Sequence, residues 1–176
     1  MKKILVLLSL CFILISGLYA DTLVAYFSYT GEAQELAITV ADVLDADLFQ
    51  VVPSLSYTDE EVNRKNKDSR YAFEAGHPGS RPAFDGSIDA SPYDTIVLVY
   101  PVWYRRCPNI MCTFVESLHL DGKKVVPLAV GKHWVKRSGK RLKKVADKGA
   151  IFVKAKRLNS DVLDQEIVYY LKSVVD

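Results

Sequence analysis

Residues 22–44 constrain the fold of this 176-residue chain more than any other stretch. They open with an almost continuous apolar run over residues 23–27, which is typical of a strand buried on both faces of a parallel sheet. After residue 32, small and apolar side chains recur at helical spacing, at Leu36, Ala37, Val40, Ala41 and Leu44. The stretch therefore predicts a strand, a tight turn and a helix that packs back onto the strand.

The turn between them reads Ser28-Tyr29-Thr30-Gly31. The first N–H groups of a helix have no intrahelical partner, so a phosphate can accept hydrogen bonds from them and from nearby hydroxyls. A simpler interpretation is that Ser28 or Thr30 caps the helix and that Gly31 relieves the turn. The motif alone leaves both interpretations open.

The first 20 residues have the pattern of a secretory signal peptide. Lys2 and Lys3 precede an apolar run over residues 4–18, and Ala20 supplies a small residue for cleavage. We therefore expect a signal peptide over residues 1–20, one folded domain over residues 21–176, and export to the periplasm or another extracytoplasmic space. The alternative is an uncleaved segment that holds the protein at the membrane, although the run is short for a span.

The remaining residues carry an uneven charge. Residues 21–100 hold 5 basic and 14 acidic side chains (net −9), whereas residues 101–176 hold 16 basic and 7 acidic ones (net +9). The most basic stretch, residues 136–144, fits the solvated face of a helix, and we favour that interpretation over nucleic-acid binding.

Two cysteines remain beyond the signal segment, Cys107 and Cys112. Their side chains would have to converge unusually to form a disulfide, so we expect free thiols. The histidines and cysteines show no metal-ligand spacing, and we predict no metal site.

The rest of the chain alternates between strand and helix patterns. Further strands are predicted at residues 47–52, 95–100, 124–130 and 150–155. The helices predicted between and after them are a polar helix over residues 58–74 that opens on a capping box, a helix starting at Pro108, a basic helix over residues 138–148, and a last helix capped by Ser160. This alternation predicts an α/β fold, with helices on both faces of a parallel sheet.

Three predicted loops, at residues 28–33, 101–106 and 131–138, follow strands and would meet at the carboxyl edge of the sheet, where such folds bind ligands. They carry four aromatic side chains, Tyr29, Trp103, Tyr104 and Trp134. Aromatic loop residues beside an anion-binding turn indicate a flat, conjugated ligand.

The Ser28–Gly31 turn, taken together with the sequence YPVWY at residues 100–104, resembles the flavodoxin-like family and in particular short bacterial flavodoxins. The similarity extends over residues 22–175. It implies a three-layer α/β/α fold, a five-stranded parallel sheet in the order 2-1-3-4-5, and a site for flavin mononucleotide (FMN). The matching positions are Ser28, Tyr29, Thr30, Gly31, Glu32 and Ala33 in the phosphate loop, Pro101, Val102, Trp103 and Tyr104 beside the flavin ring, and Gly131, Lys132, His133 and Trp134 in the third loop.

The chain also departs from the family pattern. Glu32 and Ala33 stand where an Asn-Thr pair is usual, and a carboxylate near a phosphate is repulsive. The third loop is bulkier and more cationic, and Arg105 and Arg106 replace small residues. These cations would either compensate Glu32 and favour a reduced flavin, or fill the pocket.

The sequence supports three alternative hypotheses about function. The leading hypothesis is an exported FMN-binding electron carrier or oxidoreductase that reduces a quinone or flavin, with an unknown redox partner. The alternative is a degenerate flavodoxin-like fold that has lost tight FMN binding and serves as an interaction module. A third is binding of a nicotinamide dinucleotide through Lys132 and Arg137.

Overall fold

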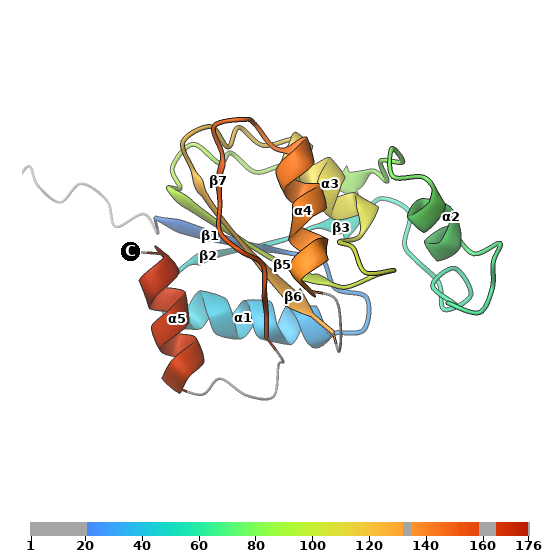
Figure 1. Cartoon of the computed structure of the whole chain (residues 1–176), viewed down its shortest axis with the longest axis horizontal. Helices are drawn as coiled ribbons and strands as arrows, with labels where there is room; N and C mark the ends of the chain where they lie inside the picture. The colour runs from blue at the N-terminus through green and yellow to red at the C-terminus, as the bar shows by residue number, and fades with distance from the viewer. Residues whose placement is uncertain (1–20, 132–134, 159–164, 176) are drawn as a thin grey trace, which may run out of the picture.

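The computed structural model describes residues 21–131, 135–158 and 165–175. At its centre lies a parallel sheet with the strand order β2-β1-β5-β6-β7, and β8 also pairs with β6 (Figure 1). These strands are β1 (Thr22–Tyr26), β2 (Asp47–Gln50), β5 (Thr95–Pro101), β6 (Lys124–Val130), β7 (Ile151–Phe152) and β8 (Lys156–Arg157). The predicted α/β class and the order 2-1-3-4-5 of the five main strands are confirmed.

Helices cover both faces of the sheet. On one face lie α1 (Glu32–Leu44) and α5 (Gln165–Val175), and on the other lie α3 (Asn109–Glu116) and α4 (Val135–Val145) (Figure 1). Successive side chains of a strand point to opposite faces, so Leu23 and Ala25 face α3 while Val24 and Tyr26 face α1. The apolar run of β1 is therefore explained by burial on both sides.

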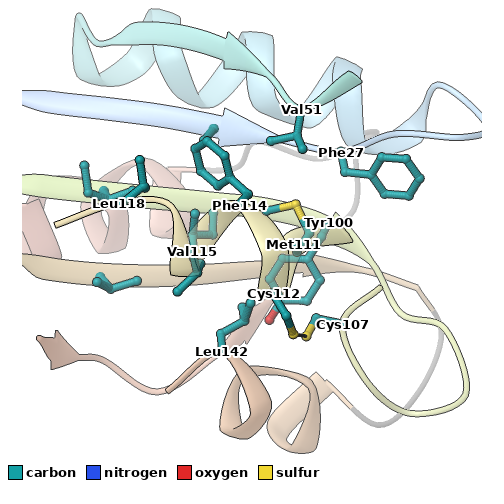
Figure 2. Packing of buried hydrophobic residues seen from close by; sticks show 14 of the residues in the cluster. Phe27, Val51, Tyr100, Cys107, Met111, Cys112, Phe114, Val115, Leu118 and Leu142 are labelled. Atoms are coloured by element: carbon teal, nitrogen blue, oxygen red, sulfur yellow. Dashed lines mark hydrogen bonds between the residues drawn. The ribbon is translucent and has the colours of Figure 1, made fainter. Parts of the chain in front are cut away.

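The core on the α3 side is rich in aromatic and sulfur-containing side chains. Tyr100 and Phe114 lie among its fully buried members, and Figure 2 shows them with Met111. The Tyr100 hydroxyl shares a hydrogen bond of 3.1 Å with the Ser138 hydroxyl of α4. This pairing satisfies both polar groups inside the core.

The predicted polar helix over residues 58–74 is wrong in its length. Thr58 and Glu61 do form the reciprocal capping-box hydrogen bonds, of 3.0 and 3.3 Å. The side chains of Asn63 and Asn66 then accept from N–H groups two residues on, and such bonds favour turns over helix. A helix, α2 (Arg70–Gly76), begins only after the Ser69 cap.

Two further corrections concern strands. The second strand ends at Gln50, and a short antiparallel pair, β3 (Val52–Pro53) with β4 (Phe84–Asp85), follows it. Of the strand predicted over residues 150–155, only β7 forms; pairing with β6 resumes at β8, just beyond the predicted range, and the gap faces Val126 and Pro127. Proline has no N–H to donate to a ladder, which accounts for the interruption.

The helix cap predicted at Ser160 lies outside the described residues. Among the helices of the described ranges, none has the length and apolar character needed to cross a bilayer.

Candidate functional site

The first loop connects β1 to α1 at the carboxyl edge of the sheet. Gly31 caps the helix with φ +94°, a backbone conformation that favours glycine, and its N–H donates to the Ser28 hydroxyl at 3.1 Å. Among the described residues no side chain caps the start of α1, so the first helical N–H groups remain directed toward the loop. Thr30 and Glu32 are exposed beside them, whereas Ala33 is buried against the sheet.

The second loop is a tight hairpin that follows β5. Trp103 and Arg106 exchange two backbone hydrogen bonds of 2.9 Å, and the residues between them, Tyr104 and Arg105, have φ of 43° and 65°. Positive φ at both central residues is the pattern of a two-residue turn that normally contains Asn or Gly. We call residues 103–106 the Trp103 hairpin.

The Trp103 ring joins the first two loops. Its centroid lies 5.5 Å from that of Phe27, with the ring planes at 88°, and Phe27 directly precedes Ser28. Edge-to-face contacts of this kind are favourable between aromatic rings. The predicted proximity of the Trp103 loop to the Ser28 loop is thus present in the structure.

The third loop begins at Gly131, which follows β6. Its position lies against the second loop, because a Cβ atom there would stand 3.6 Å from the Cβ of Val102. The Val102 N–H also donates to the Val130 carbonyl at 3.0 Å. Lys132, His133 and Trp134, as well as the side chain of Arg137, lie outside what the structure describes.

A segment that the sequence analysis did not assign to the site covers this edge. We call residues 57–76 the cover segment; it includes α2, which lies beyond the carboxyl ends of the strands (Figure 1). Two of its rings contact Trp103, with centroid distances of 5.1 Å for Tyr57 and 5.2 Å for Tyr71. The Tyr71 hydroxyl also accepts from the Tyr104 N–H at 3.1 Å.

The cover segment also holds the first loop. The Tyr29 hydroxyl donates to the Asp59 carboxylate, and this hydrogen bond raises the pKa of the Tyr29 phenol. Tyr29 is therefore oriented by Asp59. This hydrogen bond does not test the prediction that the Tyr29 ring contacts a ligand.

The sequence analysis also missed Glu74, a buried carboxylate of the cover segment itself. Only 4% of its surface is exposed, and its Oε1 accepts from the Tyr57 hydroxyl at 2.8 Å and from Arg70 Nε at 3.0 Å. Its Oε2 has no partner among the described residues. Burial raises the pKa of Glu74. In the sequence Glu74 ends a predicted polar helix, and nothing in that pattern indicated its burial.

Glu74 borders a narrow cavity of about 10 Å³, comparable to a single water, between the Trp103 hairpin and the start of α3. The cavity is also lined by Arg141 and Cys107. The thiols of Cys107 and Cys112 are free in the structure and lie side by side, with a separation of 3.7 Å between the sulfurs (Figure 2). The convergence judged unusual from sequence is therefore present.

Comparisons with known proteins agree with this architecture. The profile of the flavodoxin family matches residues 21–174. The chain belongs to the flavodoxin family. No curated protein matches it.

Solved structures give the same result. A "putative flavoprotein" of Bacteroides eggerthii is 30% identical, with a TM-score of 0.79, and the match covers 88% of this chain and 96% of that one. A second "putative flavoprotein", from Bacteroides uniformis, is 31% identical with a TM-score of 0.80 and coverage of 88% and 99%. A flavoprotein of Lactobacillus acidophilus, solved in complex with FMN, is 20% identical with a TM-score of 0.63 and coverage of 77% and 91%. That last similarity concerns the fold alone.

Proposed function

We propose that this flavodoxin-family protein binds FMN at the carboxyl edge of its sheet and acts as an electron carrier or as a reductase of a small quinone or flavin acceptor. The observation that carries the proposal is the contact between Trp103 and Phe27, at 5.5 Å. It brings an aromatic hairpin beside the uncapped start of α1, so a planar group and an anion can be bound next to each other.

The donor set fits a phosphate. The N–H groups of Glu32, Ala33 and Gln34 open α1 without a side-chain cap, and the exposed Thr30 hydroxyl lies beside them. The exposed Glu32 carboxylate acts against an anion at this place. The backbone donors of α1 therefore suit a phosphate in their arrangement, but the negative charge of Glu32 would weaken its binding.

When bound, FMN would supply one- and two-electron transfer, and the protein would supply binding, orientation and charge. The Trp103 hairpin would flank the ring, while Arg105 and Arg106 next to it favour negative charge on a neighbouring group. We expect these cations to raise the reduction potential of the bound cofactor.

A titration tests the proposal. Flavin fluorescence is quenched when the ring stacks on an aromatic side chain, so adding the purified protein to FMN should quench it, with saturation at one equivalent. The bound form should be yellow after gel filtration. Unchanged fluorescence at protein concentrations of about 100 μM, which corresponds to a binding free energy weaker than about −5.5 kcal/mol, would exclude the cofactor role.

A second candidate function is an interaction module without flavin. Its support is that three of the protein's own rings, those of Phe27, Tyr57 and Tyr71, already contact Trp103. Flavin would then have to displace the cover segment or share Trp103 with it. The same titration separates the two functions, because a module of this kind leaves FMN fluorescence unchanged.

We also propose that the protein is exported and that residues 1–20 are removed. The support is the pattern of Lys2, Lys3, the apolar run and Ala20. The intact mass of the protein recovered from its native compartment gives the mature N-terminus directly. A mass that includes residues 1–20 in a membrane fraction would show an uncleaved anchor instead.

A further inference from the structure

A cavity of about 620 Å³ lies between the Trp103 hairpin and α4. Its described lining residues are Pro78, Tyr104, Arg105, Arg106, Lys140, Arg141 and Lys144. Five of these seven side chains are cations, and none is an acid. We call this cavity the cationic pocket.

The five cations come from two elements, α4 and the Trp103 hairpin, which the fold brings together. On α4, Lys144 is four residues from Lys140 and three from Arg141, so its side chain neighbours both of them on the helix surface. Arg105 and Arg106 approach from the hairpin, whose residues Tyr104 and Arg105 have positive φ. The charge density therefore results from the meeting of two elements that are distant in sequence.

The two arginines with described contacts are held by neutral acceptors. Arg141 Nη2 donates to the Pro78 carbonyl, and Arg106 Nη1 donates to the Ala75 carbonyl at 3.3 Å. Carbonyl oxygens orient a guanidinium without neutralising its charge. Two carboxylates act on Arg141: the buried Glu74, and Glu116, which is paired with Arg81.

We propose that the cationic pocket binds a small molecule that carries two adjacent phosphate groups. A diphosphate matches several cations at once, and guanidinium groups bind phosphate oxygens in pairs. The volume lies in the range of small-molecule sites, about 300–1,000 Å³, and exceeds what a single inorganic ion fills. The half-exposed Tyr104 ring offers an apolar surface for the organic part of the ligand.

This site is separate from the proposed phosphate site at α1, because residues 28–33 are not among its described lining. It therefore does not rest on FMN binding, and either proposal can fail without the other. Tyr104 belongs to both regions, so a ligand here would lie next to the proposed flavin site.

The test is calorimetric titration of residues 21–176 with pyrophosphate, compared with orthophosphate. We expect pyrophosphate to bind more tightly, and the double variant Lys140→Gln/Lys144→Gln to weaken its binding at least about fivefold, as the loss of about 1 kcal/mol predicts. Both lysines are exposed, so the folded state should be retained, and circular dichroism checks this.

Lys143→Gln is the matched control. Lys143 is also exposed and adjoins Lys144, but it does not line the cationic pocket; it lines a different hollow, which it shares with Lys140, Gly139 and Phe152. Its substitution should change the affinity less than about twofold. An equal loss in the control would mean a general effect of surface charge and would overturn the proposal, as would the absence of pyrophosphate binding to the unmodified protein.

Two sources of a diphosphate remain, and further titrations distinguish them. ADP represents a soluble nucleotide, and phosphatidylcholine vesicles that contain farnesyl diphosphate represent a lipid-borne diphosphate. Competition with pyrophosphate by either probe supports the site and identifies the source. Binding to vesicles without the diphosphate lipid, unaffected by the double variant, would contradict it.

Discussion

The start of α1 and the cationic pocket would offer an anion different kinds of hydrogen-bond donor. At the start of α1 the donors are backbone N–H groups, and the exposed charge beside them is the carboxylate of Glu32. In the cationic pocket the donors are long side chains of α4 and the hairpin. Backbone donors are positioned by the helix itself and tolerate an unfavourable charge, whereas side-chain cations contribute charge at the cost of conformational freedom.

The largest effect is expected for Trp103→Ala, which breaks the aromatic contacts that hold the hairpin against Phe27 and the cover segment. Loss of the ring from among Phe27, Tyr57 and Tyr71 should lower the free energy of unfolding by about 3 kcal/mol. If FMN stacks on Trp103, its affinity should also fall about tenfold or more. Urea unfolding and fluorescence titration measure the two quantities.

Phe73→Ala is the control for that change. Phe73 belongs to the same cover segment, but 53% of its surface is exposed and its ring stacks on His77. Truncation there should cost less than about 1 kcal/mol and leave FMN affinity unchanged. Equal losses in both variants would mean that the cover segment, rather than Trp103, determines the affinity.

A smaller effect is expected for Gly31→Ala. Among the described residues, no atom lies within 4 Å of the added Cβ, so the loss of stability comes from the φ of +94° alone. The free energy of unfolding should fall by about 1–2 kcal/mol. Gly79→Ala is matched to it, since that position is equally open and has no positive φ. We expect the control to be neutral in urea unfolding. A similar cost at both positions would contradict the strain at Gly31.

Glu32→Gln sharpens the comparison by removing the carboxylate from the backbone-donor side. FMN affinity should rise about twofold to fivefold, and more at low salt, because a repulsion of several tenths to about 1 kcal/mol is removed. Glu35→Gln, which lies one turn further and is also exposed, should have a smaller effect. Fluorescence titrations at two salt concentrations measure both variants. Unchanged affinity in Glu32→Gln would mean that the phosphate is bound elsewhere.

The smallest effect on stability is expected at Glu74, which lines the same small cavity as Trp103 and Arg141. Burial raises its pKa in the folded state, so its protonated form stabilises the fold. That contribution is complete below the unfolded-state pKa of about 4.3 and is lost as pH rises through the folded-state pKa. Glu74→Gln cannot titrate, and its unfolding free energy should therefore vary less with pH above about 4.3. Urea unfolding across this range tests this, with the exposed Glu60→Gln as the control that should retain the slope.

Much of the fold could be predicted because its signals are local. The buried strands at β1, β5 and β6 and the helix stripe of α1 depend on residue type and spacing, which the sequence displays directly. The polar helix was overextended because the capping box of Thr58 and Glu61 is a local signal that the Asx turns at Asn63 and Asn66 override. Pro127 of β6 likewise interrupts the predicted last strand, because it has no N–H to donate to the neighbouring residues.

The candidate site was predictable only in part. Loops at the carboxyl ends of parallel strands must share one edge, so the approach of Trp103 to the Ser28 loop followed from topology. The cover segment was missed because Tyr57, Tyr71 and Glu74 lie in a stretch whose polar composition indicates solvent exposure.

By itself, the sequence determined the alternation of strands and helices, the family, and the turn that opens α1, since each depends on neighbours along the chain. Only the tertiary structure decided that the rings of the cover segment surround Trp103, that the Glu74 carboxylate is buried, and that Arg105, Arg106 and the cations of α4 line one pocket. The physical reason is that burial and charge density depend on which distant segments meet, and long-range packing sets these meetings.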